Sequence, residues 1–343
     1  MGGRTESYRP IVAVTMGDPS GVGPEVIVKA LQHPWVQERC LPVIIGDVTA
    51  LQRAMDLVRA ELPFKVIREV GHITQDKQPE DVYILCRTPL SIRDIPYGNP
   101  SAAACRETIG FIRTAVHLAL NGVVDAVVTG PIHKDVLQRQ GFSFPGHTEF
   151  LQHLTGASHV VMMLAGPKLK VALATIHCAL RDVPKRITQE NLFHTLEVLT
   201  SSLKRDFGIA CPKVAVSGLN PHAGEAGRFG REELDVIAPA VNQFRHSHPS
   251  CDVSGPYPPD TVFFRAFQGE FDAVLALYHD QGLIPLKLVH FYEATNVTLG
   301  LPIVRTSVDH GTGYDIAGKG IAHCGSLLYA MQTAVTMVRH RKS

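Results

Sequence analysis

Short apolar runs alternate with longer amphipathic stretches along most of the chain. The runs are rich in Val, Ile and Ala and show little alternation of apolar with polar positions, which is typical of strands buried on both faces of a parallel sheet. They cover residues 11–15, 42–46, 82–86, 126–129, 171–176, 214–217, 273–278 and 303–306. Because helical patterns lie between these strands over the whole length, the sequence predicts an α/β protein with a largely parallel sheet.

Four of the intervening stretches carry a helical pattern, at residues 100–121, 188–207, 231–244 and 325–339. For the first of them we expect Asn99 as the N-cap and Gly122 as the stop, since these residue types favour those positions. The last helix ends in a run of cations, which suits the negative end of a helix dipole.

Composition narrows the class of protein. The chain has 343 residues with 33 basic and 32 acidic side chains, a balance that does not indicate a nucleic-acid or membrane partner. The seven cysteines are widely spaced and form no CxxC pair, which predicts neither a disulfide framework nor a cysteine-based zinc site. No apolar run reaches the length of a membrane span, and the polar residues 1–10 do not predict a signal peptide. We therefore expect a cytoplasmic globular protein.

Three of the predicted strands each lead into a histidine. His177 follows strand 171–176, His222 comes shortly after 214–217, and His279 follows 273–278. Since the carboxyl ends of parallel strands share one edge of a sheet, the three imidazoles are expected to meet there. They suit zinc or another borderline divalent ion, and three protein ligands leave a coordination position open for catalysis. The alternative is three separate capping or hydrogen-bonding roles.

A second group of residues is suited to anions. His147 and Thr148 lie at a predicted turn into a helix that Thr148 is able to cap, and free N–H groups at a helix start attract phosphate or carboxylate. Lys287, Asn296 and Arg305 lie within or beside apolar segments, where an unpaired charge would be costly. A bound anionic substrate would supply the partner. Ordinary solvated charges are the alternative.

A glycine-rich segment precedes the last predicted helix. Residues 309–322 read DHGTGYDIAGKGIA, and glycines let a backbone approach a ligand closely. The segment is not a Rossmann fingerprint, because Ile316 stands where the third glycine would be. The alternative is a plain glycine-rich turn. The early loop 17–25 lacks the ending of a P-loop, so we expect it to shape the ligand cleft only.

Six stretches together resemble the 4-hydroxythreonine-4-phosphate dehydrogenase family of vitamin B6 biosynthesis. They are MGDPSGVGPE at 16–25, GPIHK at 130–134, GHTEF at 146–150, GLNPHAGE at 218–225, YHDQG at 278–282 and NVTLGLP at 296–302. In order and without large gaps, they span residues 11 to about 335. The segment from His310 to Ala322 is also similar to the adenosine-binding loop of isocitrate and isopropylmalate dehydrogenases.

The resemblance implies a fold of two α/β/α domains with a cleft between them, as in isocitrate and isopropylmalate dehydrogenases and unlike a Rossmann fold. Residues 1–135 plus 300–343 would form the first domain, with the cofactor loop. Residues 136–299 would form the second, with the metal ligands and the dimer contacts. It further implies a homodimer with the active site at the subunit interface.

The resemblance also implies roles for individual residues. The catalytic metal ligands would be His177, His222 and His279, with one of the three contributed by the second subunit. The substrate contacts would be His147, Thr148, Lys287, Asn296 and Arg305, with Asp260 as an acidic residue near the site. The cofactor contacts would be His310, Gly311, Thr312, Asp315 and Gly318.

The implied reaction uses NAD or NADP and one divalent metal ion per site, zinc first, with cobalt, manganese or magnesium as alternatives. It oxidises C3 of a small phosphorylated hydroxy acid, 4-phosphooxy-threonine, and then releases CO2 to give 3-amino-2-oxopropyl phosphate for pyridoxal phosphate synthesis. The chain departs from the family pattern at residues 291–296, which read FYEATN. The biosynthetic enzymes usually carry a segment rich in Gly and Arg at this place.

Two alternatives follow. Close paralogues oxidise and decarboxylate 4-phospho-threonate or 4-phospho-erythronate in sugar-acid catabolism, and the motifs do not separate the two substrates because both share the phosphate, the C3 hydroxyl and the carboxylate. A catalytically silent metal-binding protein on the same fold is the alternative from another class.

Overall fold

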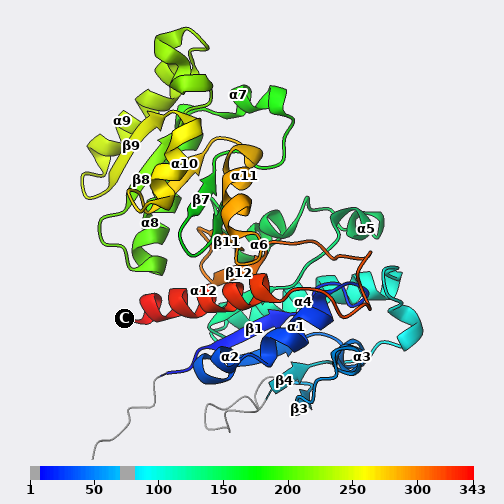
Figure 1. Ribbon diagram of the computed structural model, residues 1–343. Coiled ribbons are helices and arrows are strands. Elements are labelled where there is room, and N and C mark those ends of the chain that lie inside the picture. Colours follow the sequence, from blue (N-terminus) through cyan, green and yellow to red (C-terminus); the bar gives the residue numbers. More distant parts are fainter. Residues whose placement is uncertain (1–7, 70–81) are drawn as a thin grey trace, which may run out of the picture. The chain divides into compact units, whose positions relative to one another are not determined.

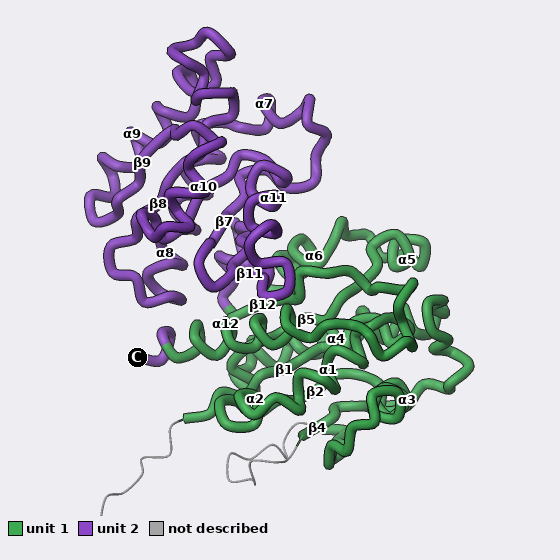
Figure 2. The backbone as a smooth tube through the Cα atoms, in the orientation of Figure 1, with its two compact units in different colours: residues 1–155, 303–339 green, residues 156–302, 340–343 purple. Residues whose placement is uncertain are grey.

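The chain divides into two compact units (Figure 2). The computed structural model describes residues 8–69 and 82–343. The expectation that residues 1–10 are not a signal peptide therefore falls mostly on residues outside the described part. Unit 1 comprises the residues up to 155 and 303–339, and unit 2 comprises 156–302 and 340–343. Residues 136–155, which the sequence analysis assigned to the second domain, thus lie in unit 1, and 300–302 and 340–343 lie in unit 2.

Unit 1 contains a sheet whose six strands are all parallel (Figure 1). The strand order is β3-β4-β2-β1-β5-β12. Their bounds are β1 Ile11–Thr15, β2 Leu41–Ile45, β3 Phe64–Ile67, β4 Val82–Leu85, β5 Ala126–Thr129 and β12 Val304–Val308. All four residues of β5 and all five of β12 are buried, as expected of strands covered on both faces.

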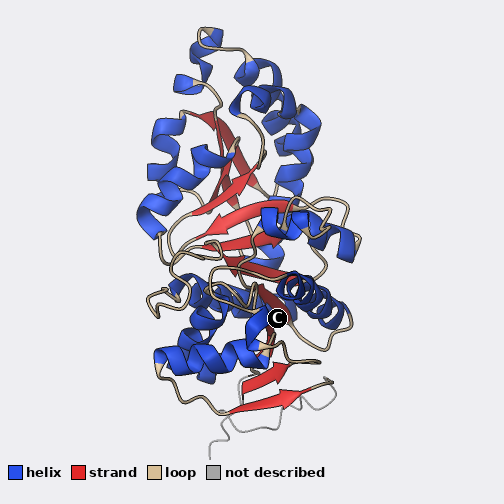
Figure 3. Ribbon diagram, turned by 90° about the vertical axis from the view of Figure 1, so that its right-hand side faces the viewer, coloured by secondary structure: helices blue, strands red, loops and turns tan. Residues whose placement is uncertain are grey.

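Helices of unit 1 lie on both sides of these strands (Figure 3). They are α1 Gly23–Leu31, α2 Pro34–Arg39, α3 Val48–Val58, η2 Ile92–Asp94, α4 Ala102–Leu120, α5 Lys134–Arg139, α6 His147–Thr155 and α12 Gly325–Lys342, whose last residues belong to unit 2. The N-cap of α4 is Ser101, whose Oγ accepts from the N–H of Ala104 at 3.0 Å. The expectation of Asn99 was therefore wrong by two residues, while Gly122 does follow the helix at φ +68°.

The sheet of unit 2 is mixed, in the order β11-β6-β7-β10-β8-β9. The strand β6 is antiparallel to both neighbours, and the remaining pairs from β7 to β9 are parallel. The bounds are β6 Val161–Ala165, β7 Lys170–Leu173, β8 Lys213–Ser217, β9 Asp252–Tyr257, β10 Ala273–Ala276 and β11 Thr295–Leu299. The prediction of an α/β protein with a largely parallel sheet is confirmed.

Two pairs of helices accompany this sheet. One pair, α10 Pro259–Phe267 and α11 His279–His290, packs on β7, β8 and β10 around a core that includes Val171, Val262 and Leu286. The other pair, α8 Gln189–Phe207 and α9 Ala238–Ser247, packs together and contacts β6, β9 and β11. The remaining short elements are η3 Leu180–Asp182, α7 Val183–Arg186, η4 Pro221–Gly227 and the π-turn η5 Glu233–Ile237.

All eight predicted strands are present, with ends shifted by up to three residues. Four strands were not predicted: β3, β6, β9 and β11. The strands β9 and β11 are partly polar and β3 is largely exposed, so none of the three has the buried apolar pattern that was sought. Within the described residues, no helix is long and apolar enough to cross a membrane.

Candidate active site

Three neighbouring parallel strands of unit 2 bring their carboxyl ends to one edge of the sheet. In the order β7-β10-β8, they lead to His177, His279 and His222. The expectation that these three strand ends share an edge is confirmed. His279 is the first residue of α11, and His222 lies in η4.

Side-chain hydrogen bonds join these strand ends. Thr175, two residues before His177, donates from Oγ1 to the carbonyl of Leu277 at 2.7 Å. Gln281 accepts from the N–H of Leu277 and donates from Nε2 to the carbonyl of Gly218, each at 2.7 Å. The segments that carry the three histidines are therefore fixed to one another by buried polar contacts, which are costly to break.

Two of the three histidines lie together. The ring centroids of His177 and His279 are 5.6 Å apart with an angle of 41° between the planes. Nδ1 of His279 is 2.7 Å from Oδ1 of Asp280, so its Nε2 is the nitrogen that faces other partners. A zinc–nitrogen bond of about 2.0–2.1 Å places the centroids of two imidazoles on one ion roughly 5–6 Å apart. The pair therefore fits the ligand spacing of a divalent ion.

His222 lies in a strained segment. His222, Ala223, Glu225 and Ala226 have φ between 44° and 55°, and Gly224 lies among them at φ 80°. Left-handed backbone costs roughly 1–2 kcal/mol for each residue other than glycine. Among the residues that the structure describes, no group of three or more His, Cys, Asp and Glu side chains lies close enough to hold a metal ion. The assignment of His222 as the third ligand stays a prediction.

Unit 1 buries a cation on strand β12. Arg305 of β12 is 1% exposed, and its Nη2 donates to Oγ1 of Thr129 on the adjacent β5 at 2.6 Å. Burial lowers the pKa of Arg305 to about 9, because removal from water disfavours the charged form. A side chain of this size and charge in a strand interior is a strong candidate for an anion contact.

His147 lies close to this arginine. Its pKa is lowered well below the usual value by burial and by the charges of Arg305 and Lys134, so the imidazole is neutral. Nε2 of His147 is buried and has no hydrogen-bond partner among the described residues, which indicates a place for a ligand atom. The helix α6 begins at His147 itself, so Thr148 lies within its first turn and the expectation that Thr148 caps it was wrong.

The two other predicted substrate contacts lie in unit 2. Lys287 lies in the last turn of α11. Asn296 lies on β11, and its Oδ1 is buried without a hydrogen-bond partner among the described residues. Asp260 is exposed in the first turn of α10. The domain bounds implied by the resemblance already separated these residues from Arg305, but they grouped His147 with them, whereas His147 lies in unit 1.

The glycine-rich segment of unit 1 is a structured turn before α12. The carbonyl of Thr312 accepts from the N–H of Val22 at 2.9 Å, and Gly318 lies against the ring of Tyr97. Asp315 is exposed and His310 is half-buried, and a side chain added at Gly311 would meet no described atom within 4 Å. The segment therefore offers open backbone to a ligand, as the cofactor assignment requires.

The sequence analysis did not predict the residues that hold this segment. Nζ of Lys29 donates to the carbonyls of Gly320 and Ala322 at 2.9 and 2.7 Å and to Oε1 of Glu25 at 2.8 Å. The same Glu25 oxygen accepts from the N–H of Ala322. Glu25, the last residue of the early loop, and Lys29 both lie on α1, so that loop does more than shape a cleft.

A second contact joins the early loop to the same segment. Tyr314 donates its hydroxyl to Oδ2 of Asp18 at 2.5 Å, and its ring stacks on His133 with centroids 5.4 Å apart. Burial raises the pKa of the Asp18 carboxyl, although the hydrogen bonds from Tyr314 and Ser20 oppose this effect. Asp18 and His133 both belong to motifs that the sequence analysis identified without assigning them a role.

The fold and these residues define a member of a known dehydrogenase family. Residues 38–334 match the family described as "Pyridoxal phosphate biosynthetic protein PdxA", and the chain belongs to it. The resemblance stated from the sequence is therefore confirmed, and with it the class of oxidoreductase.

Named relatives share almost the whole chain. A 4-hydroxythreonine-4-phosphate dehydrogenase of Desulforapulum autotrophicum is 45% identical over 326 residues, 95% of each chain. A D-threonate 4-phosphate dehydrogenase of Cupriavidus necator is 43% identical and covers 97% of this chain and 99% of its own. A crystal structure of the 4-hydroxythreonine-4-phosphate dehydrogenase from Klebsiella pneumoniae superposes with a TM-score of 0.86 at 38% identity, over 96% of this chain and 98% of that one.

Proposed function

We propose that the protein is a divalent-metal-dependent, NAD(P)-dependent dehydrogenase of 4-phosphooxy-threonine that forms 3-amino-2-oxopropyl phosphate. The observation that carries the proposal is the edge of the unit 2 sheet, where three adjacent strand ends lead to histidines and the rings of His177 and His279 lie 5.6 Å apart. We assign His222 as the third ligand, with one of the three contributed by the second subunit. A bound divalent ion would supply Lewis-acid polarisation of the substrate's C3 oxygen.

The residues of the chain would bind and orient the substrate. Arg305 and neutral His147 would hold the phosphate or carboxylate, since a buried guanidinium and a buried ring nitrogen form strong directional hydrogen bonds with such oxygens. Lys287, Asn296 and Thr148 would complete the contacts. A bound NAD(P)+ would supply the hydride acceptor for the oxidation of C3, whose hydroxyl would give up its proton. Decarboxylation would then break the C1–C2 bond, with the electron pair passing into the C3 carbonyl, and a proton taken up at C2 would complete the product.

The cofactor would lie against the glycine-rich segment. Its contacts would be His310, Gly311, Thr312, Asp315 and Gly318, where the open backbone at Gly311 supports close approach of an adenosine. We place the enzyme in the cytoplasm, since all seven cysteines, each in the described part of the chain, are free thiols.

The second candidate substrate is 4-phospho-threonate or 4-phospho-erythronate. It is favoured by the relatives named D-threonate 4-phosphate dehydrogenase and by the departure at residues 291–296. That segment leads directly to Asn296, whose buried Oδ1 lacks a hydrogen-bond partner among the described residues. An acceptor oxygen there pairs with either an amino group or a hydroxyl at C2, so the choice needs the experiment below.

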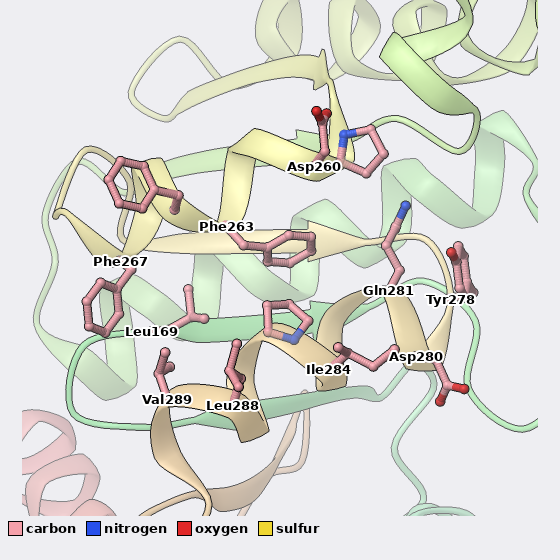
Figure 4. Close-up of a pocket in the computed structure, with 13 residues that line it drawn as sticks. Leu169, Asp260, Phe263, Phe267, Tyr278, Asp280, Gln281, Ile284, Leu288 and Val289 are labelled. Atoms are coloured by element: carbon pink, nitrogen blue, oxygen red, sulfur yellow. The ribbon is translucent and has the colours of Figure 1, made fainter.

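The homodimer has support in unit 2. A hollow of about 620 Å³ lies between α10 and α11 and is lined by apolar side chains (Figure 4). At its border Phe264, Ile284 and Leu288 are 67%, 67% and 84% exposed. Contiguous exposed apolar surface of this kind marks a protein contact. Because Tyr278 and Asp280, which flank His279 in sequence, line the same hollow, we propose that a second copy covers this face beside the metal ligands.

The test is direct. Reduction of NAD+ and of NADP+ is measured with 4-phosphooxy-threonine and with 4-phospho-threonate, before and after chelation and with each divalent ion restored. We expect turnover that is lost on chelation, and the ratio of kcat/KM values selects the substrate. Equal activity after exhaustive chelation would rule out the metal, and absence of reduction with both substrates would favour the catalytically silent alternative.

A further inference from the structure

The turn that carries His222 depends on contacts from outside itself. Four non-glycine residues of His222–Ala226 adopt left-handed backbone, a conformation that persists only where the surroundings fix it. The N–H of Ala223 bonds to the carbonyl of Asn220 at 3.1 Å, and the N–H groups of Arg228 and Phe229 bond to the carbonyls of Glu225 and Gly224 at 3.2 and 3.1 Å. These contacts lie within one short loop, so they do not by themselves fix the turn relative to the rest of unit 2. Strain of this kind is concentrated at functional sites.

The buried carboxylate of Glu233 holds the start of the turn. One oxygen, Oε1, accepts from the backbone N–H of both Leu219 and Asn220 at 2.7 Å. The other, Oε2, accepts from Nδ2 of Asn220 at 2.9 Å. Glu233 is 2% exposed, so these charge-assisted bonds are shielded from water.

The same carboxylate also lies against the turn itself. A Cβ added at Gly224, in the middle of the left-handed residues, would be 2.7 Å from Oε2 of Glu233. Nδ2 of Asn220 makes a further hydrogen bond to Oε2 of Glu232 at 2.7 Å, so one amide bridges two adjacent carboxylates. Glu232 and Glu233 lie at the start of η5, which continues into α9 and is anchored there by buried apolar residues such as Ile237.

We propose that Glu233 is a positioning residue for His222. Its carboxylate fixes residues 219–220 to the rigid η5–α9 segment and so stabilises the strained turn in the form that presents the imidazole to a metal ion. The inference rests on the proposed function, because that function makes His222 a ligand. Groups that orient a ligand without touching the metal typically change its affinity on the order of 10–100-fold.

The bridging amide of Asn220 allows a specific test. In Glu233→Gln the amide oxygen replaces Oε1, and the new NH2 group then faces Nδ2 of Asn220, donor against donor. Turning the Asn220 amide would remove that clash but would place its oxygen against the carboxylate of Glu232. If Glu232 is also changed to Gln, the turned amide accepts from both glutamines. The double variant Glu232→Gln/Glu233→Gln should therefore recover what Glu233→Gln loses.

The experiment measures binding of Zn2+ and Co2+ to the full-length protein by calorimetry and by the visible absorption of bound Co2+. We expect Glu233→Gln to weaken metal binding on the order of 10–100-fold and to alter the Co2+ spectrum. The double variant should bind within about threefold of wild type, since paired changes in one network are not additive. The matched control is Asp235→Asn, which breaks the exposed ion pair between Asp235 of η5 and Arg231 and should bind the metal as wild type does.

The outcomes separate the two levels of inference. Loss of binding in His222→Ala with unchanged binding in Glu233→Gln would overturn the positioning role and leave the proposed function intact. Unchanged binding in His222→Ala would overturn the metal assignment itself. An equal fall in melting temperature with and without metal, at unchanged affinity, would reduce Glu233 to a structural role. Should Glu233→Gln fail to fold, Glu233→Asp keeps the charge but is one methylene shorter, and it should show the same loss of affinity.

Discussion

The side chain of Gln281 donates a hydrogen bond to the carbonyl of Gly218 at 2.7 Å, across the edge of the unit 2 sheet. Its Oε1 accepts from the N–H of Leu277 at the same distance, and the side chain is almost fully buried. Gly218 opens the loop to His222, and Leu277 precedes His279 by two residues. One amide therefore couples the positions of two predicted metal ligands.

Replacing this amide should weaken both the fold and the metal site. In Gln281→Leu the carbonyl of Gly218 and the N–H of Leu277 lose their partner, at a cost of about 1–3 kcal/mol for each buried group left unpaired. We expect a lower free energy of unfolding in urea and weaker Zn2+ binding. The control is Gln243→Leu, an exposed glutamine on α9. Normal metal affinity in a destabilised Gln281→Leu protein would show that the coupling is not functional.

The second prediction concerns the anion contact of Arg305. Arg305→Met roughly keeps the volume of the buried side chain and removes its charge. We expect kcat/KM for the phosphorylated substrate to fall by a factor that corresponds to about 2–5 kcal/mol of lost transition-state stabilisation. If Arg305 holds the phosphate, the substitution should lower kcat/KM for the dephosphorylated substrate much less. Arg139→Met, an exposed cation on α5, is the control. If the effects of the substitution and of phosphate removal simply add, Arg305 does not contact the phosphate.

The third prediction concerns the glycine-rich segment. Gly311 has ordinary backbone angles and open space where a side chain would project, so Gly311→Val should fold normally. A cofactor lying on that backbone would meet the new side chain, and the KM for NAD(P)+ should rise at least about tenfold, the equivalent of one lost contact of about 1.4 kcal/mol. Gly110→Val, at another glycine with open space, is the control. Unchanged cofactor KM with unchanged melting temperature would place the cofactor elsewhere.

The fourth prediction concerns pH. The folded state lowers the pKa of His147 below its ordinary value of 6.5, so below about pH 6.5 the unfolded chain binds more protons than the folded one. The titration of His147 should therefore leave the free energy of unfolding unchanged above that pH. Below it, the free energy of unfolding should fall by up to about 1.4 kcal/mol for each pH unit.

The measurement is urea unfolding between pH 7.5 and pH 5 for wild type and His147→Gln. We expect the variant to lose part of the acid dependence, because its side chain does not titrate. His153→Gln, an exposed histidine on the same helix, should keep the wild-type dependence. An identical slope in wild type and His147→Gln would mean that His147 titrates normally in the folded protein.

Local pattern was sufficient for much of the fold. The apolar runs at 11–15 and 126–129 coincide with β1 and β5, because continuous burial on both faces demands such runs. The helix predicted at 188–207 begins at the N-cap Thr188 and ends at Gly208 with φ 69°, both chosen by chemistry within a few residues. Connectivity also sufficed to predict that the strands leading to His177, His222 and His279 end at one edge.

Only the tertiary structure decided which side chains meet. Arg305 is an ordinary cation in the sequence, and its full burial follows from the position of β12 beside β5, which pairs residues more than 170 apart. Lys287 lies in the last turn of α11 and Thr148 in the first turn of α6, so the atoms that these side chains meet depend on how the two helices pack. The left-handed turn at His222 has one glycine among five residues, so no local rule predicts it. Its geometry depends on Glu233, a partner fixed by the packing of a separate helix.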